Sequence, residues 1–223
     1  MSILQYLDLS HNQIFDMEFD CLKKLRNLQF IDLSHNYLIE LPIELFREMQ
    51  LLASVDLSDN RIRNLADNFI TSPYLERLDL SNNELSRVPT NALSAAASAS
   101  LVEMDLSGNS IPAVSIGDFA LRFRNPDQGE YWPEEPDYND EYMYHTARRD
   151  HARVYHQKKQ YPQNILYKSL AVLDLSDNHL VRIEAGTFTA LPRLRWVDLS
   201  HNSPFNNGER GLNVFKGLER KLS

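Results

Sequence analysis

The chain has 223 residues, of which 43% are hydrophobic and 24% are charged, a composition unlike that of disordered or collagen-like chains. Its formal net charge is −8 and its isoelectric point is about 5.4, which disfavours a nucleic-acid partner because binding to phosphates depends on clustered cations. No run approaches the roughly 18 apolar residues that cross a bilayer. The opening MSILQYLDLS lacks the basic start and long apolar run of a signal peptide.

One pattern of eleven residues occurs seven times along the chain. In chain order the copies read LQYLDLSHNQI, LQFIDLSHNYL, LASVDLSDNRI, LERLDLSNNEL, LVEMDLSGNSI, LAVLDLSDNHL and LRWVDLSHNSP. Their asparagines are Asn12, Asn36, Asn60, Asn83, Asn109, Asn178 and Asn202, at spacings of 24, 24, 23, 26, 69 and 24. The pattern matches LxxLxLxxNxL, whose period is roughly 20–29 residues.

Each part of the repeat predicts a local structure. The LxL core, such as Leu7 and Leu9, alternates with period 2 and predicts a short strand with one buried face. A single repeat cannot bury its apolar face alone, so stacked repeats are expected to form a parallel sheet. Each asparagine is expected to point inward at the strand end and to satisfy backbone groups of adjacent turns.

The residues after each asparagine predict the rest of the coil. Apolar residues five positions on are expected to fill its back: Met17, Leu41, Leu65, Val88, Val114 and Ile183. Those ten positions on are Leu22, Phe46, Ile70, Leu93, Phe119 and Phe188. Prolines in these segments, such as Pro42, Pro89 and Pro192, favour turns and short helices. The predicted fold is an α/β solenoid, with a curved parallel β-sheet on the concave face and short helices or turns on the convex side.

These motifs resemble the leucine-rich repeat family over roughly residues 3–120 and 168–218. The pattern LxxLPxxxFxxLxxL, seen from Leu38 to Leu52, resembles the 24-residue type common in extracellular receptors and adhesion proteins. The phrase DLSHN, beginning at Asp8, Asp32 and Asp198, resembles insect photoreceptor cell-adhesion proteins that carry a very long array and a lipid anchor. This narrower resemblance implies homophilic adhesion between membranes.

We expect a single array over residues 1–223, interrupted by an insertion at about 121–167. The first repeat begins at Leu4 in full consensus, without a cysteine-rich cap, and Leu218 falls where a further repeat would open. The sequence therefore favours an internal piece of a longer array that lacks caps at both ends.

The insertion differs in composition from the repeats. It contains seven of the ten tyrosines, namely Tyr131, Tyr138, Tyr142, Tyr144, Tyr155, Tyr161 and Tyr167. One interpretation is a long mobile loop. The other is a binding loop, in which Tyr131, Trp132, Tyr138 and Tyr142 contact a partner. A separate hypothesis is that the three tyrosines among the acids are sulfation sites if the protein is secreted. The spacing of His145, His151 and His156 does not place them on one helical face, so we predict no metal site.

Two columns of polar residues are expected to face outward on the concave side. The first is an acidic ladder of Asp8, Asp32, Asp56, Asp79, Asp105, Asp174 and Asp198. The second is Ser10, Ser34, Ser58, Ser81, Ser107, Ser176 and Ser200. Carboxylates on neighbouring strands repel by roughly 1 kcal/mol in water, so serine hydroxyls and strand-end amides are expected to compensate them. The ladder either shapes the strands or forms an acidic groove that attracts a basic partner.

The columns that vary are the better guide to a partner. Tyr6 and Phe30 are expected to lie side by side on the exposed face, and Arg195 with Trp196 forms a second patch. Together with Arg77 they are the predicted partner-binding residues of the sheet.

Catalysis is not predicted. The sequence has no GxSxG, HExxH or CxxC motif and no glycine-rich phosphate loop, so no catalytic residue, cofactor or metal is expected. The single cysteine, Cys21, excludes an internal disulfide and is interpreted as a small buried residue on the back of a coil. No Asn-x-Ser/Thr sequon occurs, which counts against an extracellular location.

The sequence as a whole favours a protein-binding module. We expect a segment of a cell-surface adhesion protein or receptor ectodomain on the extracellular face of the plasma membrane, whose partner is another protein or a second copy of this chain. Any membrane attachment would lie outside this segment. The same repeats are also compatible with a cytoplasmic scaffold or adaptor, and with a structural spacer within a long array.

Overall fold

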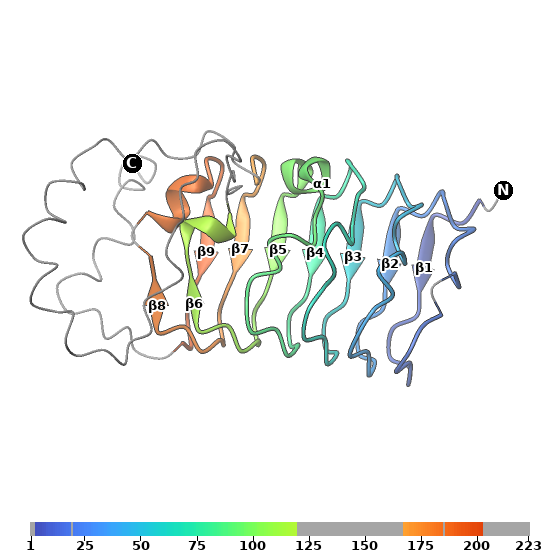
Figure 1. The fold of residues 1–223 in the computed structure, drawn as a ribbon, viewed down its shortest axis with the longest axis horizontal. Helices are drawn as coiled ribbons and strands as arrows, with labels where there is room; N and C mark the ends of the chain where they lie inside the picture. Colours follow the sequence, from blue (N-terminus) through green and yellow to red (C-terminus); the bar gives the residue numbers. More distant parts are fainter. Residues whose placement is uncertain (1–2, 19, 120–166, 185, 203–223) are drawn as a thin grey trace, which may run out of the picture. The chain divides into compact units, whose positions relative to one another are not determined.

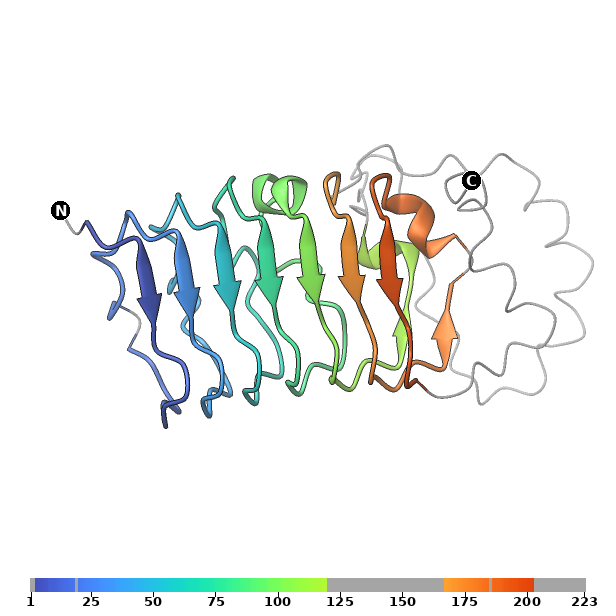
Figure 2. The same ribbon diagram turned by 180° about the vertical axis from the view of Figure 1, so that it is seen from behind.

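The computed structural model describes residues 3–18, 20–119, 167–184 and 186–202. Seven strands of three residues each form one parallel sheet in the order β1-β2-β3-β4-β5-β7-β9 (Figures 1 and 2). The strands are β1 (Tyr6–Asp8), β2 (Phe30–Asp32), β3 (Ser54–Asp56), β4 (Arg77–Asp79), β5 (Glu103–Asp105), β7 (Val172–Asp174) and β9 (Trp196–Asp198). The predicted solenoid of parallel strands is confirmed.

The alternation within each strand decides which side chains are buried. The central residue points into the coil, so Ile31, Val55 and Leu78 are at most 2% exposed. The two residues beside it point outward. All strands pair in the same register, from Tyr6 opposite Phe30 at one end to Val172 opposite Trp196 at the other. Equivalent positions of successive repeats therefore form continuous rows across the sheet.

The core lies between this sheet and the returning segments of the coil. The predicted residues ten positions after the asparagines are all buried, and they include the phenylalanines at 46, 119 and 188. Of the residues five positions after, Val88, Val114 and Ile183 are buried, whereas the others are only partly buried. Phe69 also enters the core, where its ring packs edge-on against Phe46 at a centroid distance of 5.0 Å.

The return side contains the predicted turns and short helices. The α-helix α1 (Ala95–Ser100) is capped at its N-terminus by Ser94, whose side chain accepts a hydrogen bond from the backbone N–H of Ala97. Two 3₁₀ helices, η1 (Ile116–Asp118) and η2 (Thr187–Ala190), lie in later coils. A second, two-stranded parallel sheet pairs β6 (Ala113–Val114) with β8 (Arg182–Ile183).

Cys21 is a correction to the sequence analysis. It is exposed, and its neighbour Leu22 fills the inward position at 6% exposure. The segment forms turns here, with the N–H of Cys21 bonded to the carbonyl of Glu18 and that of Leu25 bonded to the carbonyl of Leu22. A turn directs neighbouring side chains to different sides, so only one of the two reaches the core.

The solenoid continues directly across the insertion. β5 pairs with β7 in the common register although the two strands are far apart in sequence. Tyr167, which the sequence analysis places at the end of the insertion, belongs instead to the core: it is 0% exposed and its ring lies edge-on to Phe119 at 5.9 Å. The predicted binding residues of the insertion, Tyr131, Trp132, Tyr138 and Tyr142, lie outside the described residues.

None of the helices among the described residues has the length and hydropathy that a membrane-spanning segment requires.

Candidate protein-binding face

The seven asparagines of the repeats, which we call the asparagine ladder, lie at the ends of the strands, and most of them hold consecutive coils together. In the middle of the sheet, the side-chain Nδ2 of Asn60 donates to the carbonyls of Leu33, Leu57 and Ser58 at 3.0–3.1 Å, and its Oδ1 accepts from the N–H of Leu38 at 3.0 Å. One amide therefore satisfies backbone groups of its own coil and of the preceding one. Asn36, Asn83, Asn109, Asn178 and Asn202 bond in the same way. The predicted bonds between coils are present for these six asparagines, whereas Asn12 is exposed and bonds only carbonyls of its own coil.

The residue before each of these asparagines has a left-handed backbone. The φ angles of this column lie between 50° and 63°. Its members are His11, His35, Asp59, Asn82, Gly108, Asp177 and His201. All but the glycine are His, Asp or Asn, types that adopt this conformation more readily than most.

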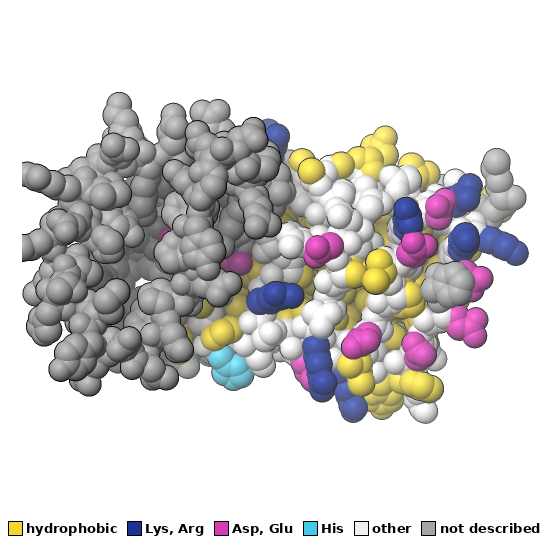
Figure 3. Space-filling model, in the orientation of Figure 1, with side chains coloured by type: hydrophobic (Ala, Val, Ile, Leu, Met, Phe, Trp, Pro, Cys, Tyr) yellow, Lys and Arg dark blue, Asp and Glu magenta, His cyan; other side chains and the backbone are white. Residues whose placement is uncertain are grey.

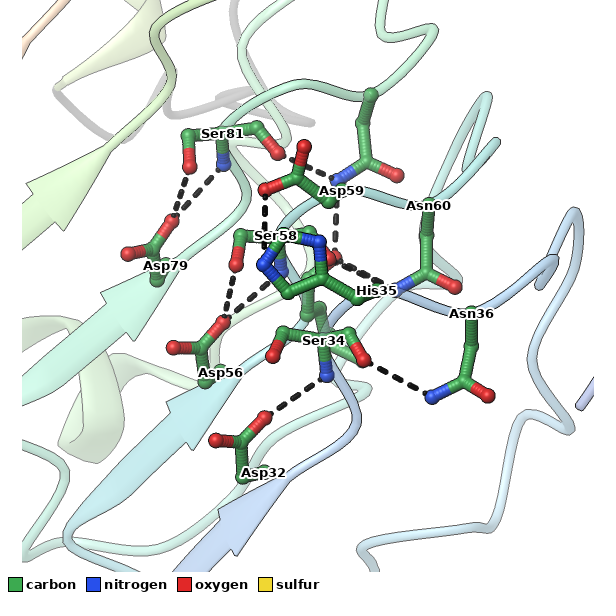
Figure 4. A network of polar contacts seen from close by, with 12 residues as sticks. Asp32, Ser34, His35, Asn36, Asp56, Ser58, Asp59, Asn60, Asp79 and Ser81 are labelled. Atoms are coloured by element: carbon green, nitrogen blue, oxygen red, sulfur yellow. Dashed lines mark hydrogen bonds and ion pairs between the residues drawn. The ribbon is translucent and has the colours of Figure 1, made fainter. Parts of the chain in front are cut away.

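The acidic ladder is built into the turn that ends each strand. In Asp56, Oδ1 accepts hydrogen bonds from the backbone N–H of Ser58 at 3.0 Å and from its hydroxyl at 2.6 Å. All seven aspartates accept the same backbone bond, and Figure 4 shows three consecutive examples. These are the serine hydroxyls and strand-end amides that we expected to compensate the carboxylates. One oxygen of each carboxylate shapes the turn.

The serine column differs from its prediction. Ser34, Ser58, Ser81 and Ser176 are at most 9% exposed. The hydroxyls of Ser58, Ser81 and Ser176 donate to Oδ1 of the aspartate two residues earlier, and the N–H of Ser34 donates to Asp32. These four serines thus support the aspartates and contribute little to the outward face, whereas Ser10 and Ser107 are half-buried and Ser200 is exposed.

The protonation equilibria along the ladder depend on position. At the two ends, hydrogen bonds from Ser10 and Ser200 lower the pKa values of Asp8 and Asp198 below their ordinary range. In the middle, burial raises the pKa of Asp105, its bonds from Ser107 oppose the rise, and the charges of Asp79 and Asp174 add to it. Burial is therefore the largest influence on the pKa of Asp105, whereas hydrogen bonds outweigh burial at Asp8 and Asp198.

Beside the acidic ladder lies a row of dissimilar side chains, which we call the variable row. It contains Tyr6, Phe30, Ser54, Arg77, Glu103, Val172 and Trp196, the first residues of the seven strands. Tyr6 and Phe30 are 59% and 43% exposed, with ring centroids 6.3 Å apart. Trp196 is 45% exposed but stands at the other end of the sheet. The predicted aromatics therefore form two separate patches.

Arg77 sits between these patches and is held by two carboxylates. Its Nη1 lies 2.9 Å from Glu103 on the next strand, and its Nη2 lies 3.1 Å from Asp79 on its own strand. Burial opposes its charged form, yet these two carboxylates raise the pKa of Arg77. Arg77 thus neutralises one part of the ladder.

A hollow of about 280 Å³ opens on the same face over β5, β7 and β9. It is lined by Glu103, Met104, Asp105, Val172, Asp174 and Trp196. Its shape follows from the variable row, where the short Val172 stands between the longer Glu103 and Trp196. Arg195, the predicted neighbour of Trp196, is exposed but does not line the hollow.

Some side chains of the column with left-handed backbone contact the equivalent residue of the next coil, which the repeat pattern did not predict. His11 and His35 stack with ring centroids 4.1 Å apart, and His35 also lies 3.7 Å from Asp59 (Figure 4). The recurrence of His, Asp and Asn directly before each asparagine was the available signal. Its cause, the positive φ, becomes visible only in the folded chain.

The described residues were compared with the arrangements that bind metal ions. No group of three or more His, Cys, Asp or Glu side chains among them could hold a metal ion. The face drawn in Figure 3 mixes acidic, basic and apolar side chains over the described part of the chain, without a continuous patch of one charge. The ordered rows of the sheet face therefore make it the candidate site.

Curated relatives match part of this chain. It is 32% identical to chaoptin of Drosophila melanogaster over 148 residues, which is 66% of this chain and 8% of that protein. It is 37% identical to chaoptin of Tribolium castaneum over 148 residues, 66% of this chain and 13% of that protein. The chain thus spans about a tenth of the length of these relatives. Chaoptin is the insect adhesion protein that the phrase DLSHN indicated.

Solved structures share the fold. The structure of a TLR13–ssRNA13 complex superposes with a TM-score of 0.60 at 22% identity, covering 89% of this chain and 22% of that one. The leucine-rich repeat domain of APL1B superposes with a TM-score of 0.54 at 18% identity, covering 89% and 48%. The family model for the leucine rich repeat matches residues 1–38, 50–111 and 165–203. This chain belongs to the leucine-rich repeat family and is similar to chaoptin.

Proposed function

We propose that this chain is a non-catalytic protein-binding module of a cell-surface adhesion protein, and that it recognises its partner through the outward face of the seven-stranded sheet. The observation that carries the proposal is the variable row. Its neighbours on the sheet recur in type and bond within the chain, whereas the variable row exposes Tyr6, Phe30 and Trp196. Folding does not require large aromatics at solvent-facing positions, and such residues contribute strongly to protein interfaces.

The similarity to chaoptin supports a location on the extracellular face of the plasma membrane, in a longer protein. The acidic ladder argues against a phosphate backbone on this face, since it lacks the clustered cations that bind one. It also bears on self-association. Two sheet faces that met directly would oppose two rows of carboxylates, so a homophilic contact would join this face to a different surface of the second copy.

Binding through the sheet face can be tested with the chain presented in multivalent form. One arm uses beads that carry the chain and measures their aggregation, which reports homophilic contact. The other arm measures binding of the fluorescent tetramer to cultured insect cells, before and after trypsin removes surface proteins. We expect trypsin-sensitive cell binding or bead aggregation, and we expect a variant with Tyr6→Ser, Phe30→Ser and Trp196→Ser to lose at least tenfold of it.

A matched variant controls for loss of exposed apolar area. Phe15, Ile43 and Tyr74 are 75%, 66% and 59% exposed and lie outside the strands of the sheet. Their replacement by serine should leave binding within about twofold. If neither arm shows binding, or if both triple variants behave alike, the chain acts as a spacer within an array and the proposal is wrong.

A further inference from the structure

The hollow over β5, β7 and β9 combines an aromatic wall with carboxylates. Trp196 forms one side and Glu103 the other, and Asp105 and Asp174 line it from the adjacent row. Strands two apart in a sheet are separated by roughly 9–10 Å. This width admits a flat group between the two walls above Val172.

Charge selects the kind of group that fits. Among the described residues, no Lys, Arg or His forms an ion pair with Asp105 or Asp174. Each carboxylate uses Oδ1 to accept from its serine, at 2.7–2.9 Å, which leaves Oδ2 without a bond from these serines. Two neighbouring anions beside an exposed indole favour a cation that both pairs with carboxylates and stacks on a ring.

The chain contains its own example of the carboxylate part of this recognition one strand away. Arg77 spans the two rows of the sheet face, with one nitrogen on Glu103 in the variable row and the other on Asp79 in the acidic ladder. That geometry suits the planar, forked guanidinium better than the point charge of a lysine. Arg77 itself pairs with Asp79 and Glu103. No described cation occupies the corresponding position beside Asp105 and Asp174, so a group from another molecule can bind there.

We propose that this hollow, lined by Trp196, Asp174, Asp105 and Glu103, is the subsite that receives an arginine side chain of a protein partner. The inference rests on the proposed function and names the chemistry by which the sheet face recognises its partner. Trp196 covers one face of the guanidinium, the carboxylates accept its N–H donors, and Val172 contacts its aliphatic stem.

A peptide titration tests the subsite directly. The probe is acetyl-Gly-Arg-Gly-amide, followed through the indole N–H signal of Trp196 in NMR spectra of the whole chain. The comparison peptide carries citrulline, which has nearly the same shape but no charge. We expect saturable binding of the arginine peptide, at least tenfold weaker binding of the citrulline peptide, and intermediate binding of a lysine peptide.

Matched substitutions locate the effect. The double variant Asp105→Asn, Asp174→Asn should weaken binding of the arginine peptide at least tenfold. The double variant Asp8→Asn, Asp32→Asn changes the same ladder position at the far end of the sheet and should alter binding less than twofold. Equal binding of the arginine and citrulline peptides, or equal effects of the two double variants, would overturn the proposal.

The outcome can be separated from that of the cell and bead tests, because the titration needs no natural partner. If the chain binds the arginine peptide but shows no multivalent binding, the proposed function is wrong and the proposed subsite still stands. The reverse result would show that the face binds protein by other groups and would overturn the subsite.

Discussion

At the scale of single residues, the asparagine ladder shows how one side chain can satisfy several backbone groups of two coils. Asn60 is 8% exposed and joins two coils, whereas Asn12 is exposed and bonds only the carbonyls of Leu9 and Ser10 in its own coil. Removing a buried amide leaves carbonyls and an N–H without partners, while water replaces the bonds of an exposed one. The same residue type therefore has different energetic weight at the two positions.

We predict that Asn60→Ala lowers the free energy of unfolding by about 2–4 kcal/mol. The matched change Asn12→Ala should cost less than about 1 kcal/mol. Urea unfolding followed by circular dichroism measures both. Equal losses at the two sites would contradict the ladder as the connection between coils.

At the scale of elements, the strands depend on their spatial neighbours more than on the order of the chain. β5 and β7 are adjacent in the sheet although Asn109 and Asn178 are 69 positions apart, 45 more than the usual period of 24. Asn178 still donates to Leu106 and accepts from Ile111, as if the repeats were consecutive. The ends of the intervening segment meet where Phe119 packs against Tyr167.

We therefore predict that the repeats fold without the intervening segment. Deleting residues 121–165 joins Ala120 to Leu166 and restores a spacing of 24 between the two asparagines. The shorter connection costs less closure entropy, so the free energy of unfolding should stay equal or rise by up to about 2 kcal/mol. Urea unfolding of the deletion variant measures this. A chain that loses its cooperative transition would show that the segment is part of the folding unit.

At the scale of the whole molecule, the aspartates of the acidic ladder have different environments at the middle and at the end of the sheet, and their pKa values shift in opposite directions. Burial and neighbouring aspartates raise the pKa of Asp105, so its charged form costs stability above its folded pKa, and this cost fades as the pH falls. Bonds from Ser200 lower the pKa of Asp198, so its charge contributes stability above the ordinary value, and this contribution is lost as the pH falls through the folded pKa. The two sites should respond to neutralisation with opposite signs.

We predict that Asp105→Asn raises the urea midpoint at pH 7 and that Asp198→Asn lowers it. The difference for Asp105→Asn should vanish below roughly pH 3.9, where aspartate is protonated in the folded and the unfolded state. The difference for Asp198→Asn should shrink as the pH falls from there through the lower folded pKa of Asp198. Urea titrations at pH 3 and pH 7 make the comparison. A lower midpoint for Asp105→Asn at pH 7 would mean that its bonds to Ser107 outweigh the desolvation and repulsion.

The sequence alone determined the solenoid, the parallel strands, the inward asparagines and the buried positions behind them. These features follow from spacings that recur within each repeat, and local alternation decides which side of a strand faces the core. The positions of Cys21, Tyr167 and the four buried serines depended on turns and on neighbouring coils, so their prediction was wrong. Only the tertiary structure placed Val172 between Glu103 and Trp196, and bound Arg77 to its two carboxylates. These contacts join residues of different repeats, and their distances depend on strand register and side-chain size across the sheet.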